Sequence, residues 1–283
     1  MMKASEGIIR KKNKVANNIQ MVLLSVLFLL YFFPFAFVVI NSFKSTKEFL
    51  TSPLAFPLKL EISNYIIAFD KMKYTYTFAN SLIITAFSVA LIAIFSSMTA
   101  YLFVRYKWKL NMYIFFIMVA SMIIPFQAIM IPLVKIYGSV GMLNSKWALI
   151  YMYVGFGANL VVFIYHGFLK NIPLELEEAA MIDGCTKLQT FFKIVFPLLK
   201  PTTVSIIILD MLWIWNDFLL PNLVLIKPEN RTLPLSTFYF FGTYTVDYGL
   251  LMASLMMTMI PIIVVYLFLQ KHIIKGVMQG SIK

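Results

Sequence analysis

The sequence has one cysteine and two histidines, and these shortages exclude several kinds of chemical site. Cys185 is the single cysteine, so the chain cannot form an internal disulfide and has no thiolate pair for a metal. His166 and His272 are far apart, and the sequence offers no credible catalytic constellation around either of them. It also lacks a glycine-rich loop ending in Gly-Lys-Ser or Gly-Lys-Thr, whose amides would cradle nucleotide phosphates. We therefore expect no catalytic residue, no metal site and no cofactor in this chain.

Charged residues are also scarce, while apolar residues are abundant. Of 283 residues, 13% are charged and 61% are hydrophobic, a balance that excludes an ordinary soluble domain. The net charge of +12 would suggest nucleic acid as a partner of a soluble protein. In a membrane protein, basic loops facing anionic lipid explain the charge better, so we expect membrane lipid and no nucleic acid as a partner.

Long apolar runs predict an all-α membrane protein with six transmembrane helices. The first run contains twenty residues without charge, enough to cross a bilayer, and no small-residue cleavage pattern of a signal peptide follows it. The predicted spans are 21–40, 81–104, 112–134, 147–169, 202–226 and 250–270. Six crossings leave both ends of the chain on the same side.

The distribution of basic residues predicts which side that is. Fifteen of the 24 lysines and arginines lie in segments that share one side of the membrane. Because cytosolic loops carry the excess of basic residues, we place there the N-terminal tail 1–19, the loop 170–201 and the C-terminal tail 271–283. The C-terminal tail either reaches a partner or is attracted to lipid.

The loop 170–201 is the longest polar break in the second half of the chain, and it predicts two short helices around a bend. Pro173 suits a first helical turn, and the glutamates that follow it favour the positive end of the helix dipole. Gly184 can adopt the left-handed conformation that ends such a helix. Thr186 and Gln189 have the spacing of a capping box that opens a second helix.

The second helix is predicted to be amphipathic and to end at a proline. Its apolar side is formed by Leu188, Phe191, Phe192 and Val195. Pro197 and Pro201 are expected to end it before the next apolar run. Such an element suits docking of a soluble partner, although an ordinary amphipathic loop helix would have the same pattern.

The spacing of nine residues in this loop resembles the cytoplasmic EAA loop of permease subunits of bacterial ABC importers. The matching residues are Glu178, Ala179, Ala180, Asp183, Gly184, Phe191, Ile194, Pro197 and Pro201. Cys185 departs from the alanine usual in that family, a small change because cysteine is also small and apolar.

Further segments extend the resemblance to the carbohydrate-uptake branch of these permeases, the maltose and multiple-sugar type. They are 41–44, 80–81, 100–101, 105–106, Pro125, Gln127, Pro132, 141–144, 215–218 and 276–280. The resemblance implies a permease that forms half of a sugar pathway in a prokaryotic cytoplasmic membrane. It implies as partners a second homologous permease, a solute-binding protein outside the membrane, and two ATPase subunits that bind ATP and Mg. It also implies that the ATPase contact is carried by Glu178, Ala179, Ala180, Asp183 and Gly184.

The substrate path is predicted from polar residues within the spans. Asp210 and Asp217 are the only acids inside an apolar run, and their seven-residue separation would place them on one helix face. We expect the path to be lined by Trp213, Asn216 and Asp217, with Asn159 and Gln127 as further candidates. The alternative for Asp217 is a structural bond to a donor on a neighbouring helix.

Two other classes of membrane protein fit the sequence less well. An ion-driven secondary transporter often has two related halves, and no internal repeat is evident here. A membrane enzyme would need clustered His, Asp or Glu near the membrane surface, and none is apparent. If the protein is an importer permease, a phosphorylated polyol or a peptide is an alternative cargo.

Overall fold

The computed structural model describes residues 2–242 and 246–281, and the side chains of 17–242 and 246–270. The chain is helical almost throughout, and the one β-bridge of the described part joins Phe241 to Val246. The α-helices are α1 (Met2–Ser42), α2 (Thr46–Thr51), α3 (Ser63–Lys71), α4 (Tyr74–Arg105), α5 (Lys109–Ser121), α6 (Phe126–Ser139), α7 (Lys146–Leu169), α8 (Glu175–Ile182), α9 (Lys187–Thr190), α10 (Phe196–Leu198), α11 (Lys200–Asn216), α12 (Leu219–Val224), α13 (Leu233–Ser236) and α14 (Tyr248–Ser281). Short π- and 3₁₀-helices occupy Phe191–Val195, Pro228–Asn230 and Thr237–Phe240.

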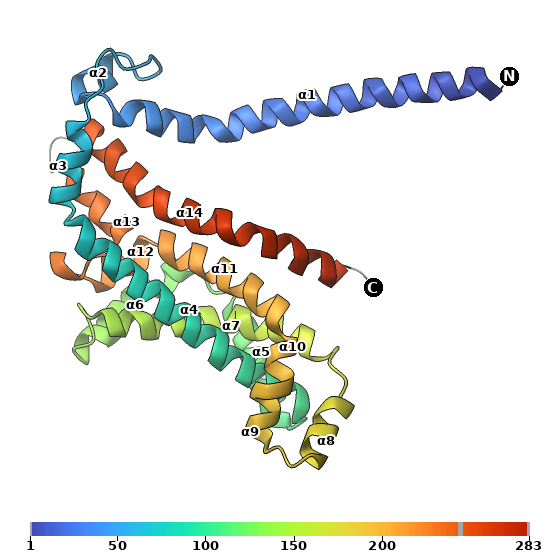
Figure 1. The fold of residues 1–283 in the computed structure, drawn as a ribbon. Coiled ribbons are helices and arrows are strands. Elements are labelled where there is room, and N and C mark those ends of the chain that lie inside the picture. The colour runs from blue at the N-terminus through green and yellow to red at the C-terminus, as the bar shows by residue number, and fades with distance from the viewer. Residues whose placement is uncertain (1, 243–245, 282–283) are drawn as a thin grey trace. The chain divides into compact units, whose positions relative to one another are not determined.

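The chain forms two compact units. Unit 1 contains residues up to Phe69 together with Phe240–Met257, and unit 2 contains Asp70–Tyr239 together with the segment from Thr258. Within unit 2, α4, α7 and α11 pack against one another, and Figure 1 shows them running side by side.

The membrane-spanning helices confirm the predicted fold class, with two corrections to the individual spans. Within the described residues, four segments are long and apolar enough to cross a membrane: Asn17–Ser42, Tyr74–Arg105, Lys146–Leu169 and Tyr248–Gln270. Two bent helix pairs raise the number to six if each pair is one span. The protein is therefore an all-α membrane protein.

The predicted third span, 112–134, is broken rather than continuous. Helices α5 and α6 meet at an angle of 107°. Pro125 is the N-cap of α6 and has extended backbone angles. Its ring disfavours helical angles at Ile124 and offers no N–H to continue α5, so the helix is interrupted there. The break opens space between these two helices and α7.

The predicted fifth span, 202–226, is interrupted at Asp217. Helix α11 ends at Asn216, and Asp217 adopts an extended conformation before the short helix α12. Its Oδ1 accepts a hydrogen bond of 2.9 Å from the backbone N–H of Leu219. A short acidic side chain that bonds nearby backbone favours such a helix end.

The interior of unit 2 is built by close approach of small residues on helices. A Cβ added at Gly157 of α7 would lie 2.7 Å from Cδ1 of Ile92 on α4. On α4 itself, Ser96, Ser97 and Ala100 are buried. Small residues let membrane helices approach closely, which explains why α4 and α7 make the main contact of this unit.

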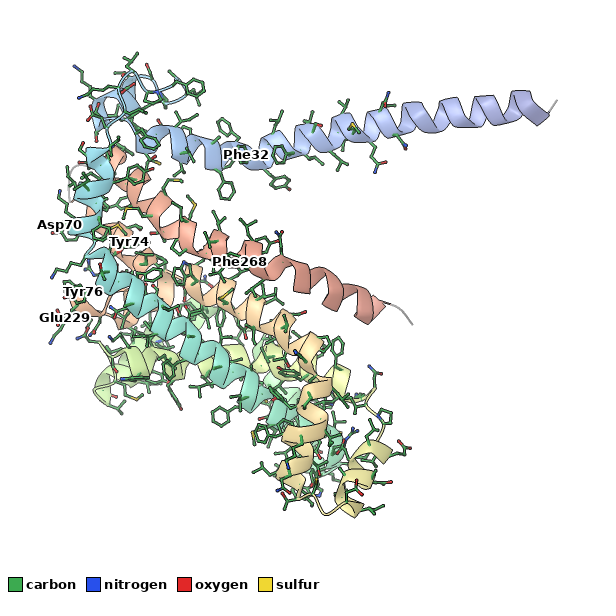
Figure 2. All side chains as sticks on the ribbon, in the orientation of Figure 1. Phe32, Asp70, Tyr74, Tyr76, Glu229 and Phe268 are labelled. Carbon is green, nitrogen blue, oxygen red and sulfur yellow. The ribbon has the colours of Figure 1, made fainter. Side chains whose placement is uncertain are left out.

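A polar network joins the segments at the end of unit 2 where α4 begins. Asn80 donates to the backbone carbonyl of Glu229 at 2.8 Å and accepts from Lys146 Nζ at 3.0 Å. Figure 2 shows Glu229 beside Tyr76, near the start of α4. Asn144 accepts from the backbone N–H of Lys227 at 2.8 Å. Two of the segments that carried the family resemblance therefore tie loops together.

Unit 1 is organised around Lys44, which is fully buried. Its Nζ donates to the carbonyls of Ser52 at 2.8 Å and Pro53 at 3.3 Å. Asn64 donates to the carbonyl of Lys44 at 2.9 Å. A Cβ at Gly249 would lie 2.5 Å from that same carbonyl, so only glycine fits there. These bonds satisfy the buried polar groups of the segment after α1.

Candidate functional site

The predicted bend in the loop 170–201 is present. Gly184 has a φ of +87°, the left-handed conformation expected of it. The capping box is also confirmed, since the N–H of Thr186 donates to Gln189 Oε1 at 2.9 Å and the N–H of Gln189 donates to Thr186 Oγ1 at 3.3 Å. Pro173 lies before the first turn rather than in it, because α8 begins at Glu175. We call residues 170–201 the elbow.

The second helix of the elbow runs one residue past Pro197 and ends at Leu198, between the two prolines predicted to end it. Residues Phe191–Val195 form a π-helix in which the N–H of Phe196 bonds to the carbonyl of Phe191. The wider turn accommodates a proline whose ring would clash with an ordinary α-turn. The break comes at Leu199, where the helix axis bends by 76° into α11.

The apolar side of this second helix is only partly turned inward. Phe191 and Val195 are buried, whereas Leu188 and Phe192 are exposed. The exposed pair lies on the outer side of this helix.

An ion pair that the sequence did not predict anchors the elbow to α4. Glu177 is 3% exposed at its side chain and Arg105 14%, and their charged groups approach to 2.6 Å. Tyr101 donates to Glu177 at 2.7 Å, and Arg105 also donates to the carbonyl of Ile172 at 2.9 Å. Glu177 lies three residues before Ala180, so the two side chains share one face of α8, and both are buried. This helical spacing is the sequence signal that could have indicated an inward-facing acid.

The five predicted coupling residues separate into exposed and buried positions. Glu178, Ala179, Asp183 and Gly184 are exposed, while Ala180 is 6% exposed and packs inward beside Glu177. Ile182 is the most exposed large apolar residue of the elbow, at 86%. Figure 1 shows α8 and α9 together at the end of α4 opposite its start. The elbow thus presents acidic, small and apolar groups outward.

A cavity of about 490 Å³ lies within unit 2 and brings together four of the five residues predicted for the substrate path. They are Gln127, Asn159, Trp213 and Asp217. The rest of the lining is Ser121, Met122, Ile124, Phe126, Phe156, Leu160, Leu219 and Leu220. The break between α5 and α6 and the break at Asp217 both contribute residues to this cavity.

Asn216 and Asp210 do not join this lining. The Asn216 side chain is exposed and donates to the carbonyl of Leu212 at 2.8 Å. Asp210 is 5% exposed, and its Oδ2 has no hydrogen-bond partner in the part of the chain that the structure describes. The prediction that Asp210 and Asp217 share a helix face is wrong, because α11 ends before Asp217.

Hydrogen bonds and ring contacts fix the polar groups of the cavity. Tyr153 on α7 donates to Asp217 Oδ2 at 2.9 Å, so the alternative of a structural bond to a neighbouring helix is confirmed. The ring of Trp213, 43% exposed, meets the Tyr153 ring edge-on at 5.6 Å. Asn159 donates to Ser121 at 2.9 Å. Asp217 therefore has both positions: it bonds to Tyr153 of α7, and it lines the cavity.

A second cavity of about 430 Å³ shares five lining residues with the first. It adds Tyr137 and Tyr151, whose rings lie 6.4 Å apart and which the sequence reasoning missed. Within the described residues, no group of three or more His, Cys, Asp or Glu could hold a metal ion. The two cavities thus offer aromatic faces and uncharged hydrogen-bonding groups, with Asp217 as the single acid in their linings.

Known proteins match this chain over most of its length. The family described as "Binding-protein-dependent transport system inner membrane component" matches residues 92–279. A probable starch degradation products transport system permease protein, AmyC of Thermoanaerobacterium thermosulfurigenes, is 45% identical over 91% of this chain and 94% of its own. The multiple sugar-binding transport system permease protein MsmG of Streptococcus mutans is 37% identical over 97% of this chain and 100% of its own.

Solved structures share the fold. A bacterial ABC transporter involved in import of the acidic polysaccharide alginate has a chain that matches with a TM-score of 0.77. It is 23% identical, and the match covers 92% of this chain and 97% of that chain. The chain described here belongs to the family of binding-protein-dependent transport system inner membrane components, the permeases of ABC importers.

Proposed function

We propose that this permease forms half of the translocation pathway of an ATP-driven importer for a carbohydrate, with an oligosaccharide as the favoured cargo. The observation that carries the proposal is the buried Arg105–Glu177 pair, which fastens an exposed elbow to the end of a membrane-spanning helix. A partner that moves α8 must then move α4 with it. The relatives that transport starch products and multiple sugars support the class of cargo.

In this mechanism the elbow docks on a separate ATPase in the cytosol. Glu178, Ala179, Asp183 and Gly184 form the contact, and Ile182 enters an apolar recess of the ATPase. Ala180 acts from within by allowing α8 to pack closely. Two ATPase subunits bind ATP and Mg, close on ATP, and carry the elbow toward the outward-open state. A second homologous permease completes the pathway, and a solute-binding protein delivers the cargo.

This arrangement places both chain ends in the cytosol of a prokaryotic cell and the network around Asn80 outside. The predicted boundaries of the tails, 1–19 and 271–283, follow from the same orientation. Helix α1 begins at Met2 and α14 continues to Ser281, so the helical backbone extends through most of both predicted tails. The predicted role of the C-terminal tail rests on side chains beyond residue 270, which lie outside the described ones.

The cavity beside Trp213 is the proposed sugar path in this subunit. Its volume, about 490 Å³, falls in the range of roughly 300–1,000 Å³ typical of small-molecule sites. Trp213 offers a face for stacking, while Gln127 and Asn159 offer amide groups. Because no basic residue occurs among the described side chains that line it, a phosphorylated polyol is a poorer fit than a neutral sugar. An ion-driven transporter does not fit a member of this family.

The coupling proposal is tested by Ala179→Trp in the assembled importer. The bulky side chain should block the close approach of the ATPase, so copurification of the ATPase and uptake should both fall at least tenfold. Ala79→Trp is the matched control, since Ala79 is an exposed helical alanine at the other end of α4. Equal ATPase copurification in the two variants would refute the docking role of the elbow.

The path proposal is tested separately by Trp213→Ala. The variant should retain the ATPase, because Trp213 lies about three turns beyond the elbow on α11 and lines the cavity instead. It should raise the KM for uptake of the sugar at least fivefold, owing to the lost stacking face. An unchanged KM and kcat would exclude Trp213 from the path while leaving the coupling proposal intact.

A further inference from the structure

A third cavity of about 440 Å³ lies on unit 2 beside the elbow, and neither coupling nor the sugar path uses it. It lies where α4 ends, α5 begins and α7 ends. Its lining comprises Phe103, Tyr106, Lys107, Trp108, Lys109, Asn111, Met112, Phe115, Phe116, His166 and Lys170. No acidic residue occurs among the described side chains that line it.

The lining has a cationic part and an apolar part. Lys107, Lys109 and Lys170 are all exposed and line one space from the connection after α4, the start of α5 and the end of α7. The apolar part is supplied by α5, where Met112 and Phe116 are exposed. Three lysines that share one space without a carboxylate in the lining attract an anion, and an exposed apolar wall favours a hydrocarbon partner.

We propose that this cavity binds one anionic phospholipid. The phosphate group lies among Lys107, Lys109 and Lys170, and an acyl chain runs along α5 past Met112 and Phe116. A free phosphate would leave the apolar wall uncovered, and a neutral lipid would leave the lysines unpaired. Basic pockets between membrane helices recognise lipid headgroups in this way.

Aromatic rings at the cavity place it at the boundary between hydrocarbon and water. Trp108 and Tyr106 lie side by side, with ring centroids 5.7 Å apart. His166 stacks on Phe115 with centroids 4.1 Å apart, which fixes the wall between the two parts of the lining. Trp and Tyr concentrate at this depth of a bilayer, where a headgroup phosphate also lies. That the leaflet is the cytosolic one rests on the orientation in the proposed function.

The cavity also borders the segment that anchors the elbow. Lys187 of α9 lies 5.2 Å from the centre of the Tyr106 ring, which lines the cavity. Asn111, also in the lining, donates to the carbonyl of Tyr106 at 2.8 Å. Tyr106 directly follows Arg105, the residue that holds Glu177. A lipid bound in the cavity therefore lies next to the residues that fasten the elbow to α4.

The experiment measures lipid retention by native mass spectrometry of the assembled importer in detergent, with phosphatidylglycerol or phosphatidylcholine added. Wild-type protein should retain phosphatidylglycerol in preference to phosphatidylcholine. The variant Lys107→Gln/Lys109→Gln/Lys170→Gln should bind phosphatidylglycerol roughly a hundredfold more weakly, as expected from the loss of three lysines near an anionic headgroup. The control Lys71→Gln/Lys135→Gln/Lys227→Gln removes three exposed lysines outside the cavity and should bind as wild type does.

Three results would overturn the lipid proposal. The first is equal retention of phosphatidylglycerol by the two triple variants. The second is equal retention of both lipids by the wild type. The third is complete displacement of phosphatidylglycerol by inorganic phosphate, which would identify a free-anion site instead. Because retention needs no transport, failure here is distinguishable from failure of the coupling proposal, which ATPase copurification reports.

Discussion

The carboxylate of Glu177 is satisfied by two donors at once, the guanidinium of Arg105 and the hydroxyl of Tyr101. A buried ion pair contributes little net stability over apolar packing, but breaking it by removing one partner is costly. The pair instead sets the orientation of α8, because Arg105 also donates to the carbonyl of Ile172 just before that helix.

We predict that Arg105→Gln and Glu177→Gln each destabilise the permease by about 3 kcal/mol, because each leaves a buried charge without its partner. The double variant should cost less than the two single costs added together, since the unpaired charge is then absent. Thermal unfolding in detergent measures all four proteins. Additive losses would show that the two side chains do not act as a pair.

At position 184 the backbone, rather than space, restricts the residue. A Cβ there meets nothing within 4 Å, but the φ of +87° is unfavourable for L-residues other than asparagine and aspartate. We predict that Gly184→Val abolishes uptake and that Gly184→Asn keeps most of it, with both proteins inserted in the membrane at normal levels. Uptake assays in cells expressing each variant test this. Normal uptake by the valine variant would show that coupling does not need the left-handed bend at Gly184.

At the scale of elements, helix ends decide where the functional residues gather. The apolar runs predicted where the chain crosses the membrane, since hydropathy alone carries that information. They did not predict the 107° angle between α5 and α6 or the extended residue at Asp217. Each break depends on a local backbone bond or a proline ring together with what packs against it. The polar residues of the proposed sugar path were therefore foreseeable, and the shape of the cavity that they line was not.

The contact between α4 and α7 gives a prediction for an element pair. Gly157→Ala should destabilise the permease by about 1–3 kcal/mol, because the added methyl group overpacks against Cδ1 of Ile92. Ile92→Val removes that carbon, so Gly157→Ala/Ile92→Val should recover most of the loss. Thermal unfolding of the single and double variants is the measurement. A double variant less stable than either single one would place the strain elsewhere, such as at Trp213, 3.4 Å from the same position.

For the molecule as a whole, the proposed orientation can be tested with its natural single cysteine. Cys185 is partly exposed in the elbow, so a membrane-impermeant maleimide should label it in inside-out vesicles and not in intact cells or right-side-out vesicles. The matched probe is Lys227→Cys in a Cys185→Ser background, which should show the opposite pattern. Labelling of Cys185 from outside the cell would show that the elbow faces outward, which would refute the coupling proposal.

The sequence by itself determined the fold class, the family and the two chemical features of the elbow that depend on neighbours in the chain, the Gly184 bend and the Thr186–Gln189 cap. Tertiary structure alone decided which residues meet across the chain. It paired Arg105 with Glu177, turned Ala180 inward, joined Tyr153 to Asp217 and left Asn216 outside the cavity. Hydropathy and capping act over a few residues and can be read in order, whereas contacts between α4, α7 and α11 depend on packing angles that no local pattern specifies.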